Sequence, residues 1–504
     1  MLTNLPAKAL IAILAGALMV LAFSPFDLFI FILIGPALFY WLMLGVQHAR
    51  HALLIGWSFG FGLFGAGVSW VWVSIHVYGY TSVPIATLAT LLFVAGLAIL
   101  FAAQAWLFFR FFSQRPHAWL AFIAIWILFE WLRSWLLTGF PWLLTGYAWL
   151  DTPFSHLASL LGVWGLSLLT LCLAVAGFHA VKERSFIALV VALLLPLMTL
   201  ISPSHWTEEV PDTQLKIALV QPNISQHDKW DRRLLGTMLQ HLIELSLPYQ
   251  DHDLIVWPET AIPSLYYQAA PYVEPFLAEL EARQTTLISG FPYMATDSQR
   301  PEIRHFHNSL GIFSSGSGVY HKQRLVPFGE YVPLENQLRG LINFFDLPMS
   351  EFSLPEYTEL TLSVQGRTLA PLICYEIAYP ELTRRSAREA DMIITVSNDA
   401  WFGDSLAAEQ HLQIARMRAI ENGRWLIRGT NDGITAVVAP NGNIAERISR
   451  EQASVLSASV PSMRGNTPYQ RWGIGPVLFI SFMLLGFTLW PRARHSFKNN
   501  TVTG

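Results

Sequence analysis

The stretch Leu369-Ala370-Pro371-Leu372-Ile373-Cys374-Tyr375-Glu376 delivers a thiol where an apolar run gives way to polar residues. Short apolar runs bounded in this way are typical of buried strands, so we place Cys374 at the end of a strand. The only other cysteine, Cys172, lies in the apolar run Leu168–Leu173, where a small buried hydrophobe is the simplest interpretation. Two cysteines exclude a disulfide scaffold and a cysteine-rich metal site.

Two charged residues stand at the ends of other β-like runs, in Trp257-Pro258-Glu259 and in Tyr320-His321-Lys322. Sites in α/β proteins gather at strand ends. A thiol attacks a carbonyl carbon as thiolate, so it needs a base or a positive field, and the intermediate needs donors for its oxyanion. Glu259 suits the base and Lys322 the donor. Taken singly, the thiol would be a core residue and the charges solvated surface groups. Together the three favour an acyl-transfer site.

The composition is that of a membrane protein. The chain is 53% hydrophobic and 13% charged, whereas globular chains carry about 25% charge. The net charge of −3 gives no global basic field for nucleic acid. A spanning helix needs about 20 apolar residues. Eight segments qualify: 7–23, 27–46, 53–76, 84–109, 117–136, 157–180, 186–202 and 472–490. The first lacks a small-residue cleavage site and is followed at once by the second, which disfavours a signal peptide.

Basic residues in the short loops predict the orientation of these spans. Every second loop carries them: Arg50, then Arg110 and Arg115, then Lys182 and Arg184. The loops at 24–27, 78–82 and 137–155 carry none. This alternation predicts a membrane domain over residues 1–205 with seven spans, an extracytoplasmic domain over 213–460, an eighth span over 472–490 and a cytoplasmic tail over 491–504.

Between Thr213 and Ser459, short apolar runs alternate with amphipathic ones, which indicates an α/β domain with one core. The expected strands are Lys216–Gln221, Leu254–Trp257, Thr286–Gly290, Ser309–Ser314, Gly318–His321, Thr368–Cys374, Met392–Ser397, Trp425–Thr430 and Ile434–Ala439. The expected helices are Arg232–Ser246, Pro275–Arg283, Pro380–Glu389 and Ala407–Asn422.

Longer strings around the three strand ends carry a family resemblance. Trp257-Pro258-Glu259-Thr260, the lysine of Tyr320-His321-Lys322 and Ile373-Cys374-Tyr375-Glu376 resemble the Glu–Lys–Cys triad of the carbon–nitrogen hydrolase (nitrilase) superfamily, whose fold is an α-β-β-α sandwich. Two further stretches, Leu325–Pro333 and Ser397–Asp404, narrow this resemblance to one family within the superfamily. With the eight expected spans, the chain resembles the apolipoprotein N-acyltransferase family, an α-helical polytopic membrane domain joined to a nitrilase-like α/β domain.

This resemblance implies a two-step reaction without a cofactor. Cys374 takes an acyl chain from a phospholipid, typically phosphatidylethanolamine, and passes it to the α-amino group of a diacylglyceryl-cysteine at the N-terminus of an apolipoprotein. Glu259 moves the protons and Lys322 stabilises the oxyanion. The resemblance also implies the bacterial inner membrane, a periplasmic catalytic domain, cytoplasmic termini and a monomer. The alternative is a membrane-anchored amidase or nitrilase-type hydrolase, with water as the acceptor. A transporter is disfavoured because symmetric repeats are not evident.

Glu330 matches a family glutamate that supports the triad, although a loop carboxylate capping a turn is the plainer interpretation. The amide of Tyr375 is expected to complete an oxyanion hole. Glu376 begins a helix-like run, where a carboxylate favours the N-terminus, so structural and catalytic interpretations both stay open.

Three aromatic residues are candidates for substrate binding. Trp230 matches a family tryptophan linked to substrate handling, or is an anchor at the membrane interface. Trp401 and Phe402 wall the acyl site, dock on the membrane or pack in the core. Glu130 and Arg133 share a helix face and could pair, with no role assigned. The segment 138–142 is aromatic and helix-breaking, and is a candidate lipid entrance. Fifteen histidines show no ligand spacing, so no metal is expected.

Overall fold

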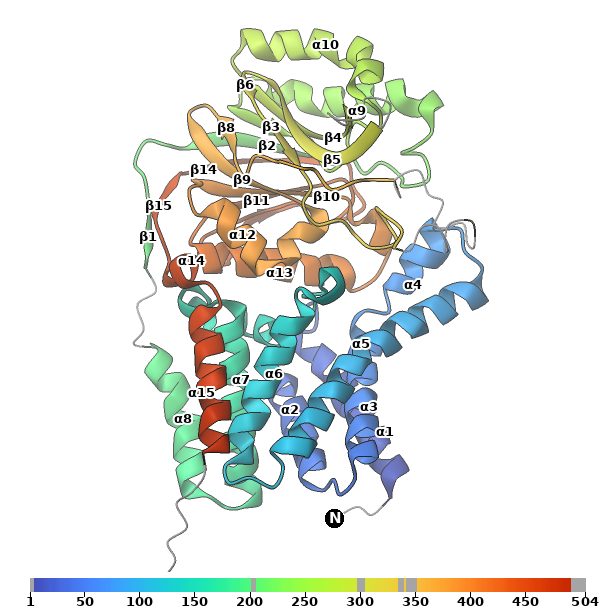
Figure 1. Cartoon of the computed structure of the whole chain (residues 1–504). Coiled ribbons are helices and arrows are strands. Elements are labelled where there is room, and N and C mark those ends of the chain that lie inside the picture. The colour runs from blue at the N-terminus through green and yellow to red at the C-terminus, as the bar shows by residue number, and fades with distance from the viewer. Residues whose placement is uncertain (1–3, 201–204, 297–303, 334–339, 341–350, 491–504) are drawn as a thin grey trace, which may run out of the picture.

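The computed structural model describes residues 4–200, 205–296, 304–333, 340 and 351–490. A bundle of apolar helices carries an α/β half (Figure 1). The helical half consists of α1 (Leu5–Met19), η1 (Val20–Ala22), α2 (Ile30–Leu44), α3 (Ala49–Gly67), α4 (Val71–Val73), η2 (Ser74–Tyr78), α5 (Val83–Phe111), α6 (Ala118–Arg133), η3 (Leu136–Thr138), η4 (Thr145–Trp149), η5 (Ser155–Leu157), α7 (Ala158–Lys182), α8 (Phe186–Leu200) and α15 (Gly475–Leu489). Each of the eight predicted apolar segments overlaps helix over its described residues; residues 201–202 of the seventh lie outside them.

Three continuous helices in the described part of the chain are long and apolar enough to cross a membrane. They are Leu5–Ala22, Val83–Phe111 and Ser155–Lys182, and α3 with α4 and η2 would make a fourth if that bent pair is one span. Large apolar side chains of α5 and α15, such as Leu92 and Phe487, point outward and are more than half exposed. Water would penalise such a surface, whereas lipid would not. The chain is a membrane protein.

The third predicted span is broken, which corrects the expectation of one helix over 53–76. α3 ends at Gly67, and the following helix is bent from it by 61°. Gly67 packs closely on neighbouring side chains, since a Cβ there would lie 2.4 Å from Leu143 Cδ1. The ring of Trp70, in the break, packs against Trp142 and Phe402. Aromatic packing at the junction with the α/β half therefore redirects the chain.

The α/β half contains two large sheets and a small ribbon. Its strands are β1 (Thr207–Glu209), β2 (Leu215–Gln221), β3 (Leu254–Val256), β4 (Thr286–Thr296), β5 (Arg304–Ser314), β6 (Gly316–Ser317), β7 (Val319–His321), β8 (Leu362–Val364), β9 (Arg367–Ile373), β10 (Met392–Ser397), β11 (Leu426–Thr430), β12 (Ala436–Val438), β13 (Ile444–Arg447), β14 (Ser454–Val460) and β15 (Met463–Gly465). The sheet orders are β13-β12-β11-β10-β9-β8-β6, β14-β2-β3-β4-β5-β7 and β1-β15.

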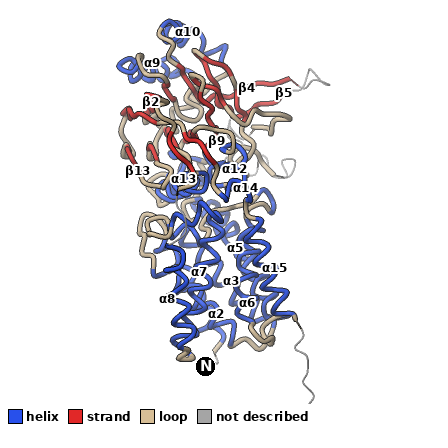
Figure 2. The backbone as a smooth tube through the Cα atoms, turned by 90° about the vertical axis from the view of Figure 1, so that its left-hand side faces the viewer, coloured by secondary structure: helices blue, strands red, loops and turns tan. Residues whose placement is uncertain are grey.

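The helices of this half are η6 (Arg232–Leu234), α9 (Leu235–Ser246), η7 (Leu247–Tyr249), α10 (Tyr266–Ala282), η9 (Cys374–Ala378), α12 (Pro380–Ala387), η10 (Asp399–Phe402), α13 (Ala407–Asn422) and α14 (Pro468–Trp472). In Figure 2, α9 and α10 cover the outer sheet, whereas α12 and α13 lie between the inner sheet and the helical half. One apolar cluster fills the space between the sheets, and another lies under α9 and α10. The predicted α-β-β-α sandwich is therefore present.

Several predicted elements differ in their bounds from the observed ones; β4 and β5, for example, are each longer than predicted. The helix expected from Pro275 begins nine residues earlier, at Tyr266, and contains both Pro271 and Pro275. The ribbon β1–β15 and the strands β6, β8, β13 and β14 lie outside the predicted strands. Thr207–Glu209 and Ile444–Arg447 are mostly exposed and polar, so pairing, and not an apolar run, makes them strands; β1 pairs with the distant β15 and β13 with the neighbouring β12.

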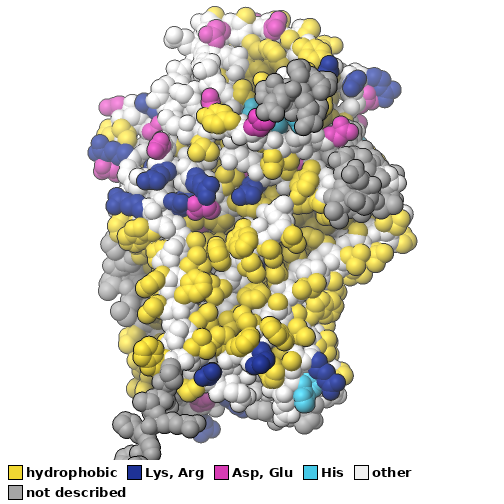
Figure 3. Space-filling view, in the orientation of Figure 1, with side chains coloured by type: hydrophobic (Ala, Val, Ile, Leu, Met, Phe, Trp, Pro, Cys, Tyr) yellow, Lys and Arg dark blue, Asp and Glu magenta, His cyan; other side chains and the backbone are white. Residues whose placement is uncertain are grey.

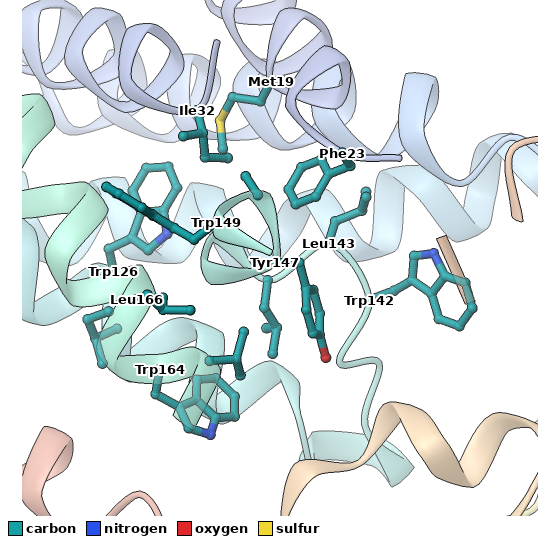
Figure 4. Packing of buried hydrophobic residues seen from close by; sticks show 14 of the residues in the cluster. Met19, Phe23, Ile32, Trp126, Trp142, Leu143, Tyr147, Trp149, Trp164 and Leu166 are labelled. Atoms are coloured by element: carbon teal, nitrogen blue, oxygen red, sulfur yellow. The ribbon is translucent and has the colours of Figure 1, made fainter. Parts of the chain in front are cut away.

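A third apolar cluster joins the two halves. It runs from α1, α2, α6 and α7 into α12 and α13. In Figure 4, side chains of the helical half surround the turn η4, which carries Tyr147 and Trp149. Polar contacts cross the same junction: Trp142 donates to Gln410 at 2.7 Å, and the amide of Val163 donates to Glu421 at 2.7 Å. Helix α13 therefore packs against the helical half as well as against the inner sheet.

Candidate active site

The two sheets bring three strand ends together. Glu259 follows β3, Lys322 follows β7, and Cys374 follows β9. Lys322 Nζ lies 3.3 Å from Glu259 Oε1. Cys374 has φ +52°, in the left-handed region, where the chain turns abruptly from strand into η9. Such a conformation is uncommon outside glycine and is retained where surrounding contacts enforce it.

Glu259 is held by contacts from four different segments. Asn308 Nδ2 donates to Oε1 at 2.9 Å, and the amide of Asn398 donates to Oε2 at 3.0 Å. Lys229 Nζ donates to the Glu259 carbonyl at 2.9 Å. β4 approaches this loop closely, because Gly290 lacks a Cβ that would stand 2.8 Å from the Glu259 Cα. The carboxylate is therefore fixed in position and direction.

Lys322 lies between two carboxylates. Its Nζ is 2.9 Å from Glu330 Oε1 as well as 3.3 Å from Glu259 Oε1, and it is 1% exposed. Asn308 Nδ2 also donates to Glu330 at 2.8 Å, and the amide of Val326 donates to its second oxygen at 2.8 Å. A buried ammonium needs such partners to remain charged. Glu330 consequently orients the lysine and, through Asn308, the other carboxylate.

The charges of the site follow from burial and from this pairing. Burial would raise the pKa of Glu259, but Lys322 and Lys229 outweigh it and hold the pKa below its usual range. Burial would lower the pKa of Lys322, but Glu330 and Glu259 raise it instead. Burial and Glu259 raise the pKa of the Cys374 thiol. These shifts indicate an ionised Glu259, a protonated Lys322 and a neutral Cys374 thiol.

Glu376 braces the turn that carries the thiol. Its Oε2 accepts from the Ile373 amide at 2.8 Å and from the Tyr320 hydroxyl at 2.9 Å, and its Oε1 accepts from the Gln323 and Arg324 amides. Burial raises its pKa to about 7, opposed by these backbone donors. The carboxylate ties η9 to the loop after Lys322, which is the structural interpretation of this residue.

The side chain of Tyr375 binds the helical half. Its hydroxyl donates to the Gly139 carbonyl at 3.1 Å, and Tyr379 donates to the same carbonyl at 3.1 Å. Both tyrosines belong to the segment that begins with Cys374. The helix-breaking segment 138–142 therefore lies directly against the turn that begins with Cys374.

Arg133 binds that segment and Glu130 binds Thr145, three residues beyond it; among the described residues no direct ion pair joins the two. Glu130 Oε1 accepts from the Thr145 amide at 2.8 Å, and Arg133 donates to the carbonyl oxygens of Phe140, at 2.9 Å, and Trp142. Backbone groups in an apolar surrounding need such partners.

The three aromatic candidates occupy two loops. Trp230 follows β2, next to Lys229; it is half-buried, and its indole nitrogen is buried without a hydrogen-bond partner. Trp401 and Phe402 end η10, where the Trp401 carbonyl accepts from Ser74 at 2.8 Å and the Phe402 ring lies 4.8 Å from Trp70. These last two rings lie at the junction with the bent end of the third helix.

Sequence reasoning missed Asn308 and Lys229. Asn308 reads as one polar residue of a strand, and Lys229 as a solvated loop charge. Both are nevertheless buried. Burial lowers the pKa of Lys229 to about 8, against the opposing charges of Glu259 and Cys374. The only sign of a role for Lys229 in the sequence was that it adjoins Trp230, a candidate for substrate binding.

Family comparisons match both halves. The model of the carbon-nitrogen hydrolase family matches residues 216–469, and that of the apolipoprotein N-acyltransferase N-terminal domain matches residues 15–176. Among solved structures, an amidase of the nitrilase superfamily from Nesterenkonia is 21% identical, covers 52% of this chain and 95% of its own, and has a TM-score of 0.35. The family match over residues 216–469 identifies the α/β half as a carbon–nitrogen hydrolase domain.

Curated relatives extend the match over the whole chain. Apolipoprotein N-acyltransferase of Azotobacter vinelandii is 44% identical, over 96% of this chain and 95% of that protein. The Pseudomonas syringae pv. tomato protein of the same name is 42% identical, over 95% and 96%. The chain therefore belongs to the apolipoprotein N-acyltransferase family. The expected family, fold class and acyltransferase activity are confirmed.

Proposed function

We propose that this chain transfers an acyl chain from a phospholipid to Cys374 and then to the α-amino group of the N-terminal diacylglyceryl-cysteine of an apolipoprotein. Family membership supports lipoprotein N-acylation. The observation that carries the residue assignment is the convergence of Glu259, Lys322 and Cys374 at neighbouring strand ends, with Lys322 between two buried carboxylates. Phosphatidylethanolamine is the proposed donor.

In the first step the thiol of Cys374 gives its proton to Glu259 as sulfur attacks the ester carbonyl. The raised pKa of the thiol and the ionised state of Glu259 favour proton transfer during attack over a free thiolate. Lys322 and the amide of Tyr375 would stabilise the oxyanion. The intermediate collapses with cleavage of the ester C–O bond, and the lysophospholipid leaves with the proton from Glu259. A thioester remains.

In the second step the amine of the acceptor attacks the thioester carbonyl and gives a proton to Glu259. The C–S bond breaks, and the departing sulfur recovers that proton. The amide and the free thiol are the products. Trp230, Trp401 and Phe402 would contact the acyl chain or the acceptor, and the unpartnered indole nitrogen of Trp230 supports this assignment for that residue.

The location of the site supports lipids as substrates. Segment 138–142 of the helical half contacts the turn of Cys374 through Tyr375 and Tyr379. Figure 3 shows hydrophobic side chains over most of the visible face of the helical half, directly below the α/β half. A nucleophile at this level is within reach of a phospholipid that diffuses in the bilayer. We place residues 1–205 and 472–490 in the bacterial inner membrane as eight spans, and we take the monomer as sufficient.

We also propose that residues 213–460 lie on the periplasmic side. The loops with Arg50, Arg110 and Lys182 and the N-terminus lie at the end of the bundle away from the α/β half (Figure 1). By the positive-inside rule this end is cytoplasmic, as would be the tail 491–504. A reporter fused near Gln226 should report the periplasm; a cytoplasmic signal would reverse the orientation.

The direct test is mass spectrometry of the detergent-purified protein with phosphatidylethanolamine, alone and with a diacylated lipopeptide. We expect an acyl adduct on Cys374 that disappears as triacylated peptide forms. Cys374→Ala should insert normally and form no adduct. A wild-type protein that releases fatty acid to water at the same rate with and without the lipopeptide would instead indicate the hydrolase alternative.

A further inference from the structure

A buried cluster of three polar side chains lies behind the backbone of Cys374. His411 of α13, Asp399 of η10 and Arg428 of β11 are each 0% exposed. His411 Nδ1 lies 3.0 Å from Asp399 Oδ1 and 3.1 Å from Arg428 Nη2, and Arg428 Nη2 lies 2.6 Å from Asp399 Oδ2. His411 Nε2 lies 3.1 Å from the carbonyl oxygen of Cys374. The cluster therefore ends on the backbone of the nucleophile.

The contacts determine where the imidazole carries its proton. A proton on Nδ1 alone would leave the Nε2 lone pair facing the Cys374 carbonyl oxygen, two acceptors 3.1 Å apart. A proton on Nε2 removes this repulsion and lets Nδ1 accept from Arg428, whose guanidinium also binds Asp399 and so offsets the approach of the Nδ1 lone pair to Asp399 Oδ1 at 3.0 Å. The imidazolium form donates from Nε2 to the Cys374 carbonyl and from Nδ1 to Asp399. Every favourable form thus donates a hydrogen bond from His411 to the Cys374 carbonyl.

We propose that His411, held by Asp399 and Arg428, is a positioning residue that fixes and polarises the peptide group between Cys374 and Tyr375. This proposal rests on the proposed function in taking Cys374 as the nucleophile and the Tyr375 amide as an oxyanion donor. The carbonyl of that peptide accepts from His411, while its N–H is the Tyr375 amide assigned to the oxyanion. A donor on the carbonyl of an amide strengthens the N–H of the same amide as a donor, because hydrogen bonds in a chain polarise one another.

The backbone and the packing around His411 agree with this role. Cys374 has φ +52°, and a hydrogen bond on its carbonyl resists rotation of the following peptide out of that conformation. The rings of Trp142 and Phe402 lie 5.6 and 6.1 Å from the imidazole and close it in from the side of the helical half. The imidazole has little freedom to turn away.

The test compares two reactions of the same sulfur. Acylation by a p-nitrophenyl ester passes through an oxyanion, whereas alkylation by iodoacetamide does not. Neither reagent requires a phospholipid, so the outcome is independent of whether the proposed donor is right. The full-length variants are His411→Leu, which removes the donor, His411→Gln, whose amide can reach the Cys374 carbonyl, and His411→Asn, whose amide is too short. Gln413→Leu, at a buried position of the same helix that contacts Tyr147, is the matched control.

We expect His411→Leu and His411→Asn to slow acylation of Cys374 at least about tenfold through kcat, a fraction of the 10²-fold that loss of a whole oxyanion donor costs. Alkylation and KM should stay close to wild type, and His411→Gln should recover most of the acylation rate. If the leucine variant fails to fold, the glutamine and asparagine variants carry the comparison. Equal losses in both reactions, unchanged acylation, or equal rates for glutamine and asparagine would overturn the proposal.

Discussion

Gly290→Ala should displace the proposed base without changing a charge. Gly290 lies in β4 beside the loop that carries Glu259, and its φ is not positive, so alanine suits the backbone conformation itself. The obstacle is space. An added Cβ would stand 2.4 Å from the Thr260 nitrogen, 2.7 Å from the Pro258 oxygen and 2.8 Å from the Glu259 Cα. All three are backbone atoms, so no side chain can turn aside.

The size of the effect follows from these distances. Ordinary contact begins at 3.4 Å, so the loop or the strand must move by about 1 Å. A misplacement of about 1 Å at a catalytic group can cost about 10²-fold in rate. Overpacking of this kind costs about 2 kcal/mol of stability. We therefore expect a folded, less stable protein whose Cys374 is acylated about 10²-fold more slowly.

The assay is single-turnover acylation of Cys374 followed by mass spectrometry, together with a thermal melt. Gly429→Ala in β11 is the matched control, because its added Cβ would meet only Val256 Cγ1, at 3.4 Å. That variant should retain its rate. If Gly290→Ala acylates at the wild-type rate, the position of Glu259 is not what limits the reaction. If Gly429→Ala slows equally, the loss is a general consequence of filling the sandwich.

Three further outcomes follow from the same site. Glu330→Gln leaves Lys322 with one carboxylate partner, so we expect a loss of about 2 kcal/mol in a denaturation experiment; an unshifted midpoint would contradict the pairing. Burial and then Glu259 raise the pKa of Cys374, so alkylation by iodoacetamide should lack the inflection of a free thiol near about pH 8.5; an inflection there would refute this. Because the pKa of Glu259 is lowered on folding, its contribution to stability is present above about pH 4.3 and is lost below it; a melting temperature that rises on acidification through this range would argue against an ionised Glu259.

The strand ends could be predicted because each key residue adjoins an apolar run in the chain. Glu259, Lys322 and Cys374 are adjacent in sequence to β3, β7 and β9, so local pattern was enough. Asn308 and Lys229 gave no such signal. Their burial depends on contacts of β5 and of the loop after β2 with Glu259 and Glu330, which are 22 to 49 residues away in sequence and outside any local window.

The burial of α13 could not be predicted from the sequence either. Its bounds, Ala407–Asn422, were predicted correctly, yet nearly every residue of it is buried, including polar ones such as Gln410 and Glu421. In sequence these residues resemble a solvated face. They are buried because the helix lies between the inner sheet and the membrane helices, and Trp142 and Val163 supply their partners. The break after Gly67 has a similar origin in contacts with Trp142 and Phe402.

The shared carbonyl of Gly139 has a mechanical consequence. Tyr375 and Tyr379 both bind it, and Cys374 precedes Tyr375 directly, so the turn that carries the sulfur is tied to the bundle as well as to the α/β half. A bilayer whose thickness tilts the helices would carry the sulfur with them. Reaction rates in vesicles of graded acyl-chain length should accordingly pass through an optimum, even for a lipid donor whose head group is held constant.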